Sequence, residues 1–306
     1  MTQSNQAEMT AFSYAALESL LEQRYDTTVA ENERGFYDLW HANSLYQRQP
    51  VEAAVIGGLL ADRPAWIFAA GYQATLKSAF PALPEQGWAA FAATEDVNDP
   101  DAHPGTTLEE TGDGCVLNGY KSWVGHSRLV DHLVITVNDP GGDKYRARGM
   151  VLPAARAGVT LSHRETPKFL APMSQGFAKF NDTRIAPDEI FPFEPIRQFG
   201  RSEAKFVMLA STAFLAAHAR EYPELRDRFV QCAAAIVGLI AEKKTSRQVY
   251  GLIDRRYQAA VDDFERTVDT SAIADYSADS RLFRMYSARI QRRVGYAQAD
   301  AGQTET

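Results

Sequence analysis

Cysteine is almost absent from this sequence, which has two cysteines among 306 residues. Cys115 and Cys232 stand far apart and match neither a Cys-x-x-Cys pair nor a cysteine–histidine spacing that would bind zinc. A disulfide framework and a structural zinc site are therefore not expected, and the composition fits a reducing compartment such as the cytoplasm.

Long apolar runs are also missing. A membrane-spanning helix needs roughly 20 consecutive apolar residues, and no run in this sequence approaches that length. The first residues, Met-Thr-Gln-Ser-Asn, lack the basic and apolar regions of a signal peptide. We therefore expect a soluble cytoplasmic protein without a membrane span.

No concentration of charge points to a nucleic-acid partner. The net charge is −7, and a nucleic-acid-binding protein would need a basic face to displace phosphate counterions. Several enzyme motifs are absent as well. The six histidines show no metal-binding spacing, and neither a Gly-x-Ser-x-Gly elbow nor a Gly-x-Gly-x-x-Gly run occurs. We expect no nucleic acid, no metal, no serine hydrolase and no nicotinamide site.

Apolar residues are plentiful, at 45% of the chain, and they fall into three zones of different periodicity. Helical spacing in the first zone predicts helices over residues 12–21, 36–45, 51–60 and 66–79. Short β-rich runs follow at 88–94, 115–123, 132–137, 149–152, 159–163 and 177–180. The helical period then returns. The pattern predicts an α+β protein with an N-terminal helical domain (1–86), a middle β-barrel domain (87–196) and a C-terminal helical bundle (197–306).

The Asn118-Gly119 step carries the strongest hairpin signal in the β zone. A type I′ turn needs positive φ at both central residues, and this dipeptide accepts that conformation readily. We therefore expect a tight turn there.

Three segments of the β zone resemble acyl-CoA dehydrogenases. Residues 112–123 read Gly-Asp-Gly-Cys-Val-Leu-Asn-Gly-Tyr-Lys-Ser-Trp, close to that family's Gly-Asp-Gly-Tyr-Val-Leu-Asn-Gly-x-Lys-x-Trp. Residues 91–95, Phe-Ala-Ala-Thr-Glu, are similar to its Ala-Leu-Thr-Glu-Pro strand end, and residues 180–187 resemble its Phe-Asp-Asp-Val-Arg-Val-Pro. The chain is thus identified as a shortened, divergent member of the acyl-CoA dehydrogenase superfamily of FAD enzymes.

The resemblance implies which residues would face the flavin. Thr94 would hydrogen-bond the isoalloxazine edge, and Trp123 would lie against the ring. Gly125 stands where the family has a threonine or serine that reaches the flavin, so Ser127 or His126 could supply the hydroxyl or its substitute. The alternative is that Trp123 is a core aromatic residue and Thr94 a strand-end residue.

The segment expected to hold the FAD pyrophosphate departs from the family pattern. The Gly-Ser-Asp loop that helps to hold the FAD pyrophosphate is replaced by residues 96–103, Asp-Val-Asn-Asp-Pro-Asp-Ala-His. Aspartates would repel a pyrophosphate unless they point away, although Asp101 could occupy the family's aspartate position. The family's Arg-x-Ser before the last barrel strand has become Ala-Pro-Met-Ser at 171–174.

Glu203 is the candidate catalytic base. One subset of the family carries a glutamate at the start of the helix after the barrel, and Glu203 lies within a turn of that place. The alternative is structural, with Ser202 as the N-cap and Glu203 favouring the helix dipole. Residues 197–200, Arg-Gln-Phe-Gly, match part of the family's FAD-contacting Arg-x-Gln-Phe-Gly. They precede the expected helix, so we interpret the match as coincidence.

Three functions remain open. The resemblance implies a flavin-dependent oxidoreductase that dehydrogenates the α and β carbons of acyl-CoA or a related thioester, as a homodimer or homotetramer. The lost loop and shortened bundle favour a non-catalytic member instead, acting as a scaffold, an acyl-CoA binder or a hetero-oligomeric subunit beside a full-length relative. A flavin-dependent oxygenating or acyl-carrier-modifying enzyme is the third. The last helix is basic, which indicates a solvated or subunit-facing surface or, alternatively, contacts to coenzyme A phosphates.

Overall fold

The structure is a computed structural model that describes residues 13–25, 29–112, 114–138, 141, 143, 146–242 and 246–303, with side chains up to residue 295. Phe12 of the first expected helix and Asp113 of the family motif lie outside the described residues. The chain divides into two compact units. The helical unit comprises Met1–Val29, Val51–Tyr72 and Glu203–Thr306, and the β unit comprises Ala30–Pro50 and Gln73–Ser202. The three-domain boundaries stay a prediction.

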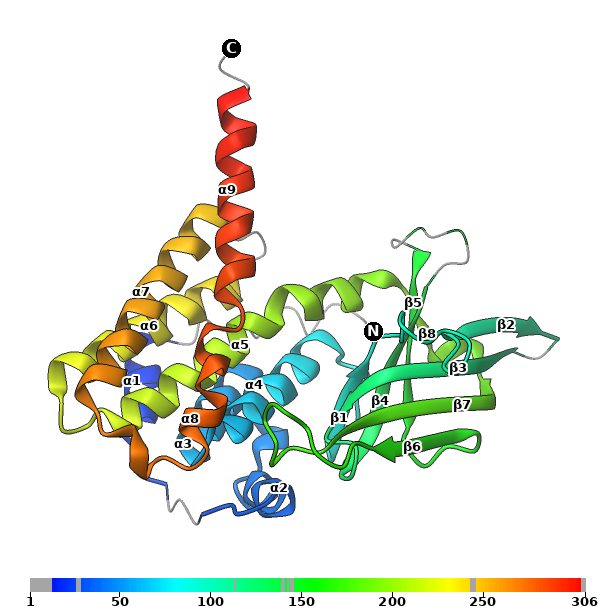
Figure 1. Cartoon of the computed structure of the whole chain (residues 1–306), viewed down its shortest axis with the longest axis horizontal. Coiled ribbons are helices and arrows are strands. Elements are labelled where there is room, and N and C mark those ends of the chain that lie inside the picture. Colours follow the sequence, from blue (N-terminus) through cyan, green and yellow to red (C-terminus); the bar gives the residue numbers. More distant parts are fainter. Residues whose placement is uncertain are drawn as a thin grey trace. The chain divides into compact units, whose positions relative to one another are not determined.

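Helices occupy both zones in which apolar residues recur at helical spacing (Figure 1). The first zone forms α1 (Tyr14–Glu22), α2 (Glu33–Ala42), α3 (Pro50–Leu60) and α4 (Pro64–Ala79), and the last forms α5 (Phe193–His218), α6 (Pro223–Ala241), α7 (Arg247–Thr267), α8 (Tyr276–Asp279) and α9 (Ser287–Gln303). Single 3-10 turns lie at Leu45–Gln47, Pro187–Glu189, Thr270–Ala272 and Ser280–Arg284. Within the described residues, no helix combines the length and the apolar character needed to cross a bilayer.

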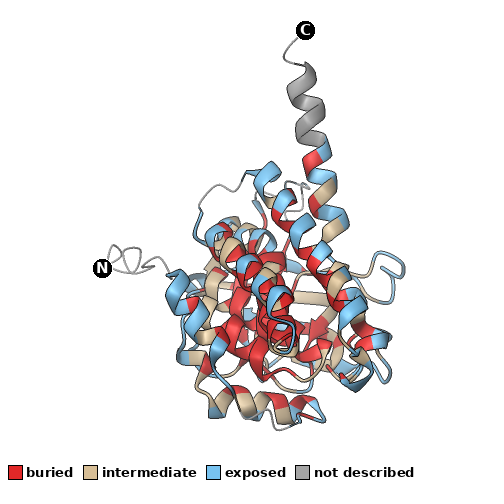
Figure 2. Cartoon of the chain, turned by 90° about the vertical axis from the view of Figure 1, so that its left-hand side faces the viewer, coloured by how far each residue is buried: buried red, intermediate tan, exposed pale blue. Residues whose placement is uncertain are grey.

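Two glycines allow close helix packing in the helical unit. A Cβ on Gly58 of α3 would lie 2.3 Å from the carbonyl oxygen of Ala210, and a Cβ on Gly71 of α4 would lie 2.4 Å from Cα of Val207. Both neighbours belong to α5, so a larger residue at either position would push α5 away. Figure 2 colours the buried residues of the chain red. α3 and α4 therefore pack closely against α5 at these two positions.

α5 begins earlier than the sequence pattern indicated. It starts at Phe193, so residues 197–200 and Ser202 lie inside the helix. The expectation that Arg-Gln-Phe-Gly precedes this helix is wrong, and so is the N-cap role of Ser202, whose Oγ instead lies 3.1 Å from Nε2 of Gln198. Pro195 does not stop the helix because first-turn N–H groups have no intrahelical partner.

The β zone forms two four-stranded sheets. Their strands are β1 (Trp88–Ala92), β2 (Thr107–Thr111), β3 (Gly114–Gly125), β4 (Val130–Val137), β5 (Arg148–Pro153), β6 (Val159–His163), β7 (Gln175–Ile185) and β8 (Ile190–Phe191). One sheet has the order β1-β4-β5-β8, with β1 and β4 parallel, and the other has the order β2-β3-β7-β6. The α+β class is confirmed, and the strand pairs formed by the described residues leave two sheets rather than one closed barrel.

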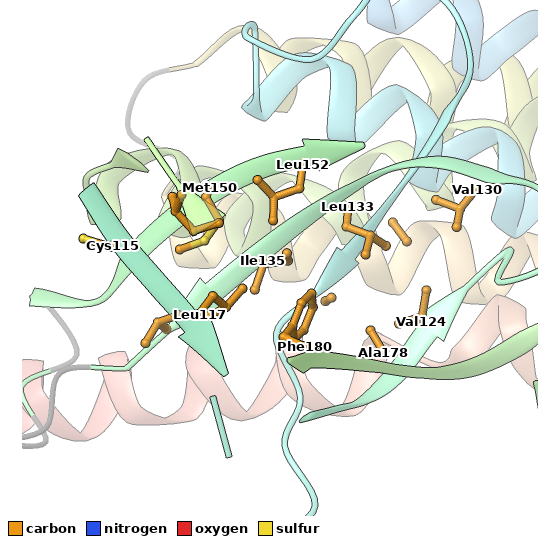
Figure 3. Packing of buried hydrophobic residues seen from close by; sticks show 14 residues of the cluster. Cys115, Leu117, Val124, Val130, Leu133, Ile135, Met150, Leu152, Ala178 and Phe180 are labelled. Carbon is orange, nitrogen blue, oxygen red and sulfur yellow. The ribbon is translucent and has the colours of Figure 1, made fainter. Parts of the chain in front are cut away.

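The β core lies between these two sheets. Figure 3 shows Leu133 and Ile135 of β4 together with Leu117 of β3 and Phe180 of β7, all nearly or fully buried. Burying a side chain of this size contributes about 1.5–3 kcal/mol relative to exposure. Two strands were not predicted. β2 reads Thr-Leu-Glu-Glu-Thr and is mostly exposed, and β8 has only two residues, so neither carries a strong apolar pattern.

The expected turn at Asn118-Gly119 is wrong, because β3 runs unbroken through both residues. The pairing of β3 with β7 shifts register between Leu117 and Gly119, which marks a β-bulge. Gly119 has a φ of 112°, and a Cβ there would lie 2.4 Å from the carbonyl oxygen of Gly105. Gly119 does adopt the positive φ that the turn required. In the structure this conformation forms a bulge and lets two backbone segments approach closely.

Candidate functional site

A buried lysine–glutamate pair underlies the predicted flavin wall. Nζ of Lys121, whose side chain is fully buried in β3, donates to Oε1 of Glu95 at 2.7 Å. Thr106 donates its N–H at 3.1 Å and its hydroxyl at 2.9 Å to the same oxygen. Burial lowers the pKa of Lys121, and Glu95 opposes that shift. Burial alone would raise the pKa of Glu95, but the bonds from Lys121 and Thr106 hold it below its usual range.

Thr94, Trp123 and Gly125 gather beside this pair. The carbonyl oxygen of Thr94 accepts the N–H of Ser122 at 2.8 Å, and the Thr94 side chain is exposed. Trp123 is half-buried, and its Nε1 donates to Oε1 of Gln175 at 3.3 Å. A Cβ on Gly125 would lie 3.0 Å from Cη2 of Trp123, so the indole packs against the glycine. The β unit thus brings these three predicted residues to one end of β3.

Ser127 and His126 are buried and already have partners within the β unit. Oγ of Ser127 lies 3.0 Å from Nδ1 of His163. His126 adopts a φ of 58°, and its Nδ1 lies 2.8 Å from Oε1 of Glu33. The flavin contact of Ser127 stays a prediction, and in this structure its hydroxyl faces His163.

The loop 96–103 satisfies its own backbone donors. Oδ1 of Asp96 accepts the N–H of Asn98 at 3.0 Å and that of Asp99 at 3.3 Å. Oδ1 of Asp99 accepts the N–H of Ala102 at 3.1 Å. Asp101 is exposed in the turn between Asp99 and Ala102. Several N–H groups that could face an anion are therefore bonded to aspartates of the loop itself.

These residues fit the two ends of a flavin nucleotide differently. The half-buried indole of Trp123, the adjacent Gly125 and the exposed Thr94 suit a flat apolar ring with polar edges. The loop 96–103 does not suit a pyrophosphate, because its carboxylates repel an anion and occupy the N–H groups that would bind one. The chain therefore fits the isoalloxazine but not the phosphate end at this loop.

Glu203 lies in α5 and belongs to the helical unit. Burial raises the pKa of its carboxyl group, while the charge of Arg289 and the hydroxyl of Tyr286 oppose the shift. Glu203 therefore sits among side chains from the C-terminal segment of its own unit. Thr94, Trp123 and the other predicted flavin residues belong to the β unit.

One polar cluster was missed by the sequence analysis. Glu33 is buried, and its Oε1 accepts the N–H of Ser174 at 3.1 Å while its Oε2 accepts the Ser174 hydroxyl at 2.6 Å. His126 completes the cluster through Oε1 of Glu33. A glutamate at a helix start ordinarily indicates only a dipole effect, so no signal in the sequence pointed to this contact.

The described residues of the β unit line the following two cavities, among others. One, of about 590 Å³, is lined partly by Arg156, Arg184 and Glu189, and Arg156 is already paired with Glu189. The other, of about 390 Å³, is lined partly by Arg34, Arg128 and Arg164. Across the described part of the chain, no group of three or more histidine, cysteine or acidic side chains is arranged to hold a metal ion.

Comparisons with known proteins give structural matches only. No family model matches the sequence, and no curated protein matches it. The chain is similar to the structure of PigA with FAD and proline (TM-score 0.65, 15% identity, 94% of this chain and 97% of that one). It is also similar to butyryl-CoA dehydrogenase from Megasphaera elsdenii (TM-score 0.62, 13% identity, 94% and 97%). A third match is the prolyl acyl carrier protein oxidase AnaB (TM-score 0.59, 15% identity, 90% and 97%).

These matches agree with the resemblance that residues 112–123 indicated. They extend over nearly the whole length of each neighbour, including the helical parts where the sequence offered no motif. Because the sequence identities are only 13–15%, these matches establish the fold of this chain and nothing further. This chain has the fold of the acyl-CoA dehydrogenase superfamily.

Proposed function

We propose that this protein is a flavin-dependent oxidoreductase of the acyl-CoA dehydrogenase kind, acting on an acyl thioester. The observation that carries the proposal is the arrangement of Thr94, Trp123 and Gly125 at one end of β3, fixed by the buried Lys121–Glu95 pair. A half-buried indole beside a glycine leaves a flat wall for a ring system. Neighbours of the same fold were solved with FAD or are described as acting on a butyryl-CoA or a carrier-bound prolyl group, which supports this choice.

Each group of this chain then has a defined task. Trp123 would cover one face of a bound flavin ring, and Thr94 would offer its hydroxyl to the ring edge. The carboxylate of Glu203 accepts the proton from the α-carbon of the thioester, for which burial has made it more basic than an exposed glutamate. A bound flavin supplies a two-electron acceptor for the hydrogen that leaves the β-carbon.

A second function is favoured by a specific observation, the self-bonded loop 96–103. If this loop never releases its N–H groups, the chain binds an acyl thioester without turnover. It would then serve as a partner subunit or an acyl-CoA binder.

Cofactor binding separates the two functions. FAD titrated into the purified protein should quench flavin fluorescence in a saturable manner and raise the melting temperature by mass action. Trp123→Leu should weaken this binding by roughly tenfold, in line with a base–aromatic stacking loss of about 1–3 kcal/mol. Glu109→Gln, an exposed change in β2, is the control.

A colourless protein that shows no thermal shift with FAD would eliminate the oxidoreductase. Stabilisation by butyryl-CoA in that same preparation would then support the non-catalytic acyl-CoA binder. Equal FAD affinity of Trp123→Leu and the wild type would remove Trp123 from the site even if flavin binds.

A further inference from the structure

The smaller cavity of the β unit has an unusual charge distribution. Three arginines line it and come from three separate segments: Arg34 from the first turn of α2, Arg128 from the connection between β3 and β4, and Arg164 from the residues after β6. Two glutamates, Glu33 and Glu165, also reach its lining. Its volume of about 390 Å³ falls in the range of small-molecule sites, roughly 300–1,000 Å³.

The carboxylate of Glu33 is engaged by Ser174 and His126. Its two oxygens accept bonds from the backbone and hydroxyl of Ser174, and Oε1 also lies 2.8 Å from Nδ1 of His126. Oγ of Ser174 in turn accepts the backbone N–H of Arg128 at 3.0 Å. Glu33 is nearly fully buried, so this network forms a rigid floor and fixes the backbone from which Arg128 projects.

The arginines themselves lack strong partners of opposite charge. Arg128 and Arg164 form no ion pair with any carboxylate in the described part of the chain, and Arg34 only approaches the exposed Asp38 at 4.0 Å. Arg164 is held in place by other means. Its guanidinium lies 4.7 Å from the ring centre of Phe177 and donates to the carbonyl oxygen of Ser122 at 3.1 Å.

We infer that this cavity binds the phosphate group of a small-molecule ligand. Guanidinium groups pair with phosphate oxygens in a bidentate manner, and three of them around one cavity favour a dianion or a pyrophosphate over a single carboxylate. The proposed function offers two sources of such a group, the coenzyme A part of a thioester and the phosphate of a flavin nucleotide, and to that extent the inference rests on it.

The cavity is linked to the Trp123 wall within the β unit. The guanidinium of Arg164 donates to the carbonyl oxygen of Ser122, the residue before Trp123. The backbone N–H of Arg164 donates to the carbonyl oxygen of Gln175 at 2.7 Å. The side chain of Gln175 accepts from the Trp123 indole. The Trp123 indole and Arg164 of the cavity are therefore joined by hydrogen bonds through Ser122 and Gln175.

The test is a calorimetric titration of the full-length protein with inorganic pyrophosphate, coenzyme A and FMN, each at low and high salt. We expect saturable pyrophosphate binding that weakens as salt rises. Arg128→Gln should weaken it by roughly tenfold or more, because hydrogen bonds to charged groups are worth about 1.5–3 kcal/mol. The side chain of Arg128 is exposed, so this variant should keep the wild-type melting temperature.

Arg247→Gln is the matched control, because it removes the same charge from an exposed position of the helical unit. The source of the phosphate group is identified by the ligand, coenzyme A or FMN, that also binds Arg128→Gln more weakly than the wild type. Absence of saturable pyrophosphate binding, or equal losses in Arg128→Gln and Arg247→Gln, would overturn the inference. Pyrophosphate binding without any flavin binding would leave the cavity assignment intact while removing the proposed oxidoreductase.

Discussion

At the scale of single residues, Lys121 is a fully buried charged side chain of the β unit. Its ammonium group is fully buried and has Glu95 as its ionic partner. Lys121→Met should lower the free energy of unfolding by roughly 3 kcal/mol, because Glu95 then stays partly buried without its cation. Urea denaturation would measure the loss, with Lys168→Met as an exposed control. A loss below 1 kcal/mol would mean that the pair does not hold the strand end.

Glu95 also predicts a pH dependence. Its folded-state pKa lies below the ordinary value, so it stabilises the fold above the ordinary carboxyl pKa of about 4.3. That contribution should disappear as pH falls through the lower folded-state pKa. Glu95→Gln should therefore show a shallower loss of melting temperature below pH 4.5 than the wild type. Identical slopes would contradict the assignment.

Glu203 should behave in the opposite sense. Its folded-state pKa is raised, so its charged form disfavours folding, and stability falls as pH rises through the window above the ordinary carboxyl pKa. Glu203→Gln should gain melting temperature relative to wild type at pH 7 but not at pH 4. If Glu203 is the base of the proposed reaction, Glu203→Gln should also lower the rate of flavin reduction by an acyl-CoA by about 10²–10⁴-fold. Glu221→Gln, exposed in the same unit, should change neither quantity.

Some of these residues could be found from the sequence and others could not. Trp123 and Thr94 stand in motifs whose spacing carries over, and the structure brings both to one end of β3. Glu33 carried no such signal, because its partners Ser174 and His126 are far away in the chain and only the folded β unit brings them together. Local patterns report local structure, and this cluster is held by long-range contacts.

At the scale of elements, two glycines of the helical unit have opposite surroundings. A Cβ on Gly71 would meet the backbone of α5 at 2.4 Å, whereas a Cβ on Gly238 of α6 would meet nothing within 4 Å. Gly71→Ala should therefore destabilise the protein by about 1–3 kcal/mol through overpacking. Gly238→Ala should stabilise it by up to about 1 kcal/mol through helix propensity. Chemical denaturation of both variants checks the contrast, and a shared sign would refute it.

Element type was easier to predict than element boundaries. The four helices of the first zone and six of the strands followed from periodicity, since burial of one face imposes it. The last zone was predicted only as a helical bundle, and α6 (Pro223–Ala241) was not predicted as a separate helix. The start of α5 and the bulge at Gly119 did not follow. In the sequence, a proline in the first turn of a helix looks the same as a proline that ends a helix. A glycine in a bulged strand likewise looks the same as a glycine in a turn.

At the scale of the whole molecule, the two compact units make the location of ligand binding testable. All three arginines of the small cavity belong to the β unit. Pyrophosphate should therefore slow amide exchange in the first turn of α2 and around residues 128 and 174. The helical unit should stay unchanged. Protection centred on the arginines of α9 would show that phosphate binds there instead.

The likeness to known structures also belongs to this scale. Identities of 13–15% are low, yet matched regions extend over nearly the whole chain. The motif of residues 112–123 pointed to that architecture because β3 carries both core residues and the predicted flavin wall. A helical core imposes weaker sequence constraints, since many apolar residues can fill a core of the same volume.

The self-bonded loop 96–103 has a consequence for how the protein matures in a cell. Its shape is fixed by Asp96 and Asp99, so folding of this segment does not wait for a cofactor. Newly made chains should then reach a protease-resistant state even when riboflavin is scarce. A pulse-chase measurement in a riboflavin-auxotrophic host would test this, and a half-life that shortens under starvation would contradict it. Under the proposed function, vitamin supply would control the activity of the protein without controlling its abundance.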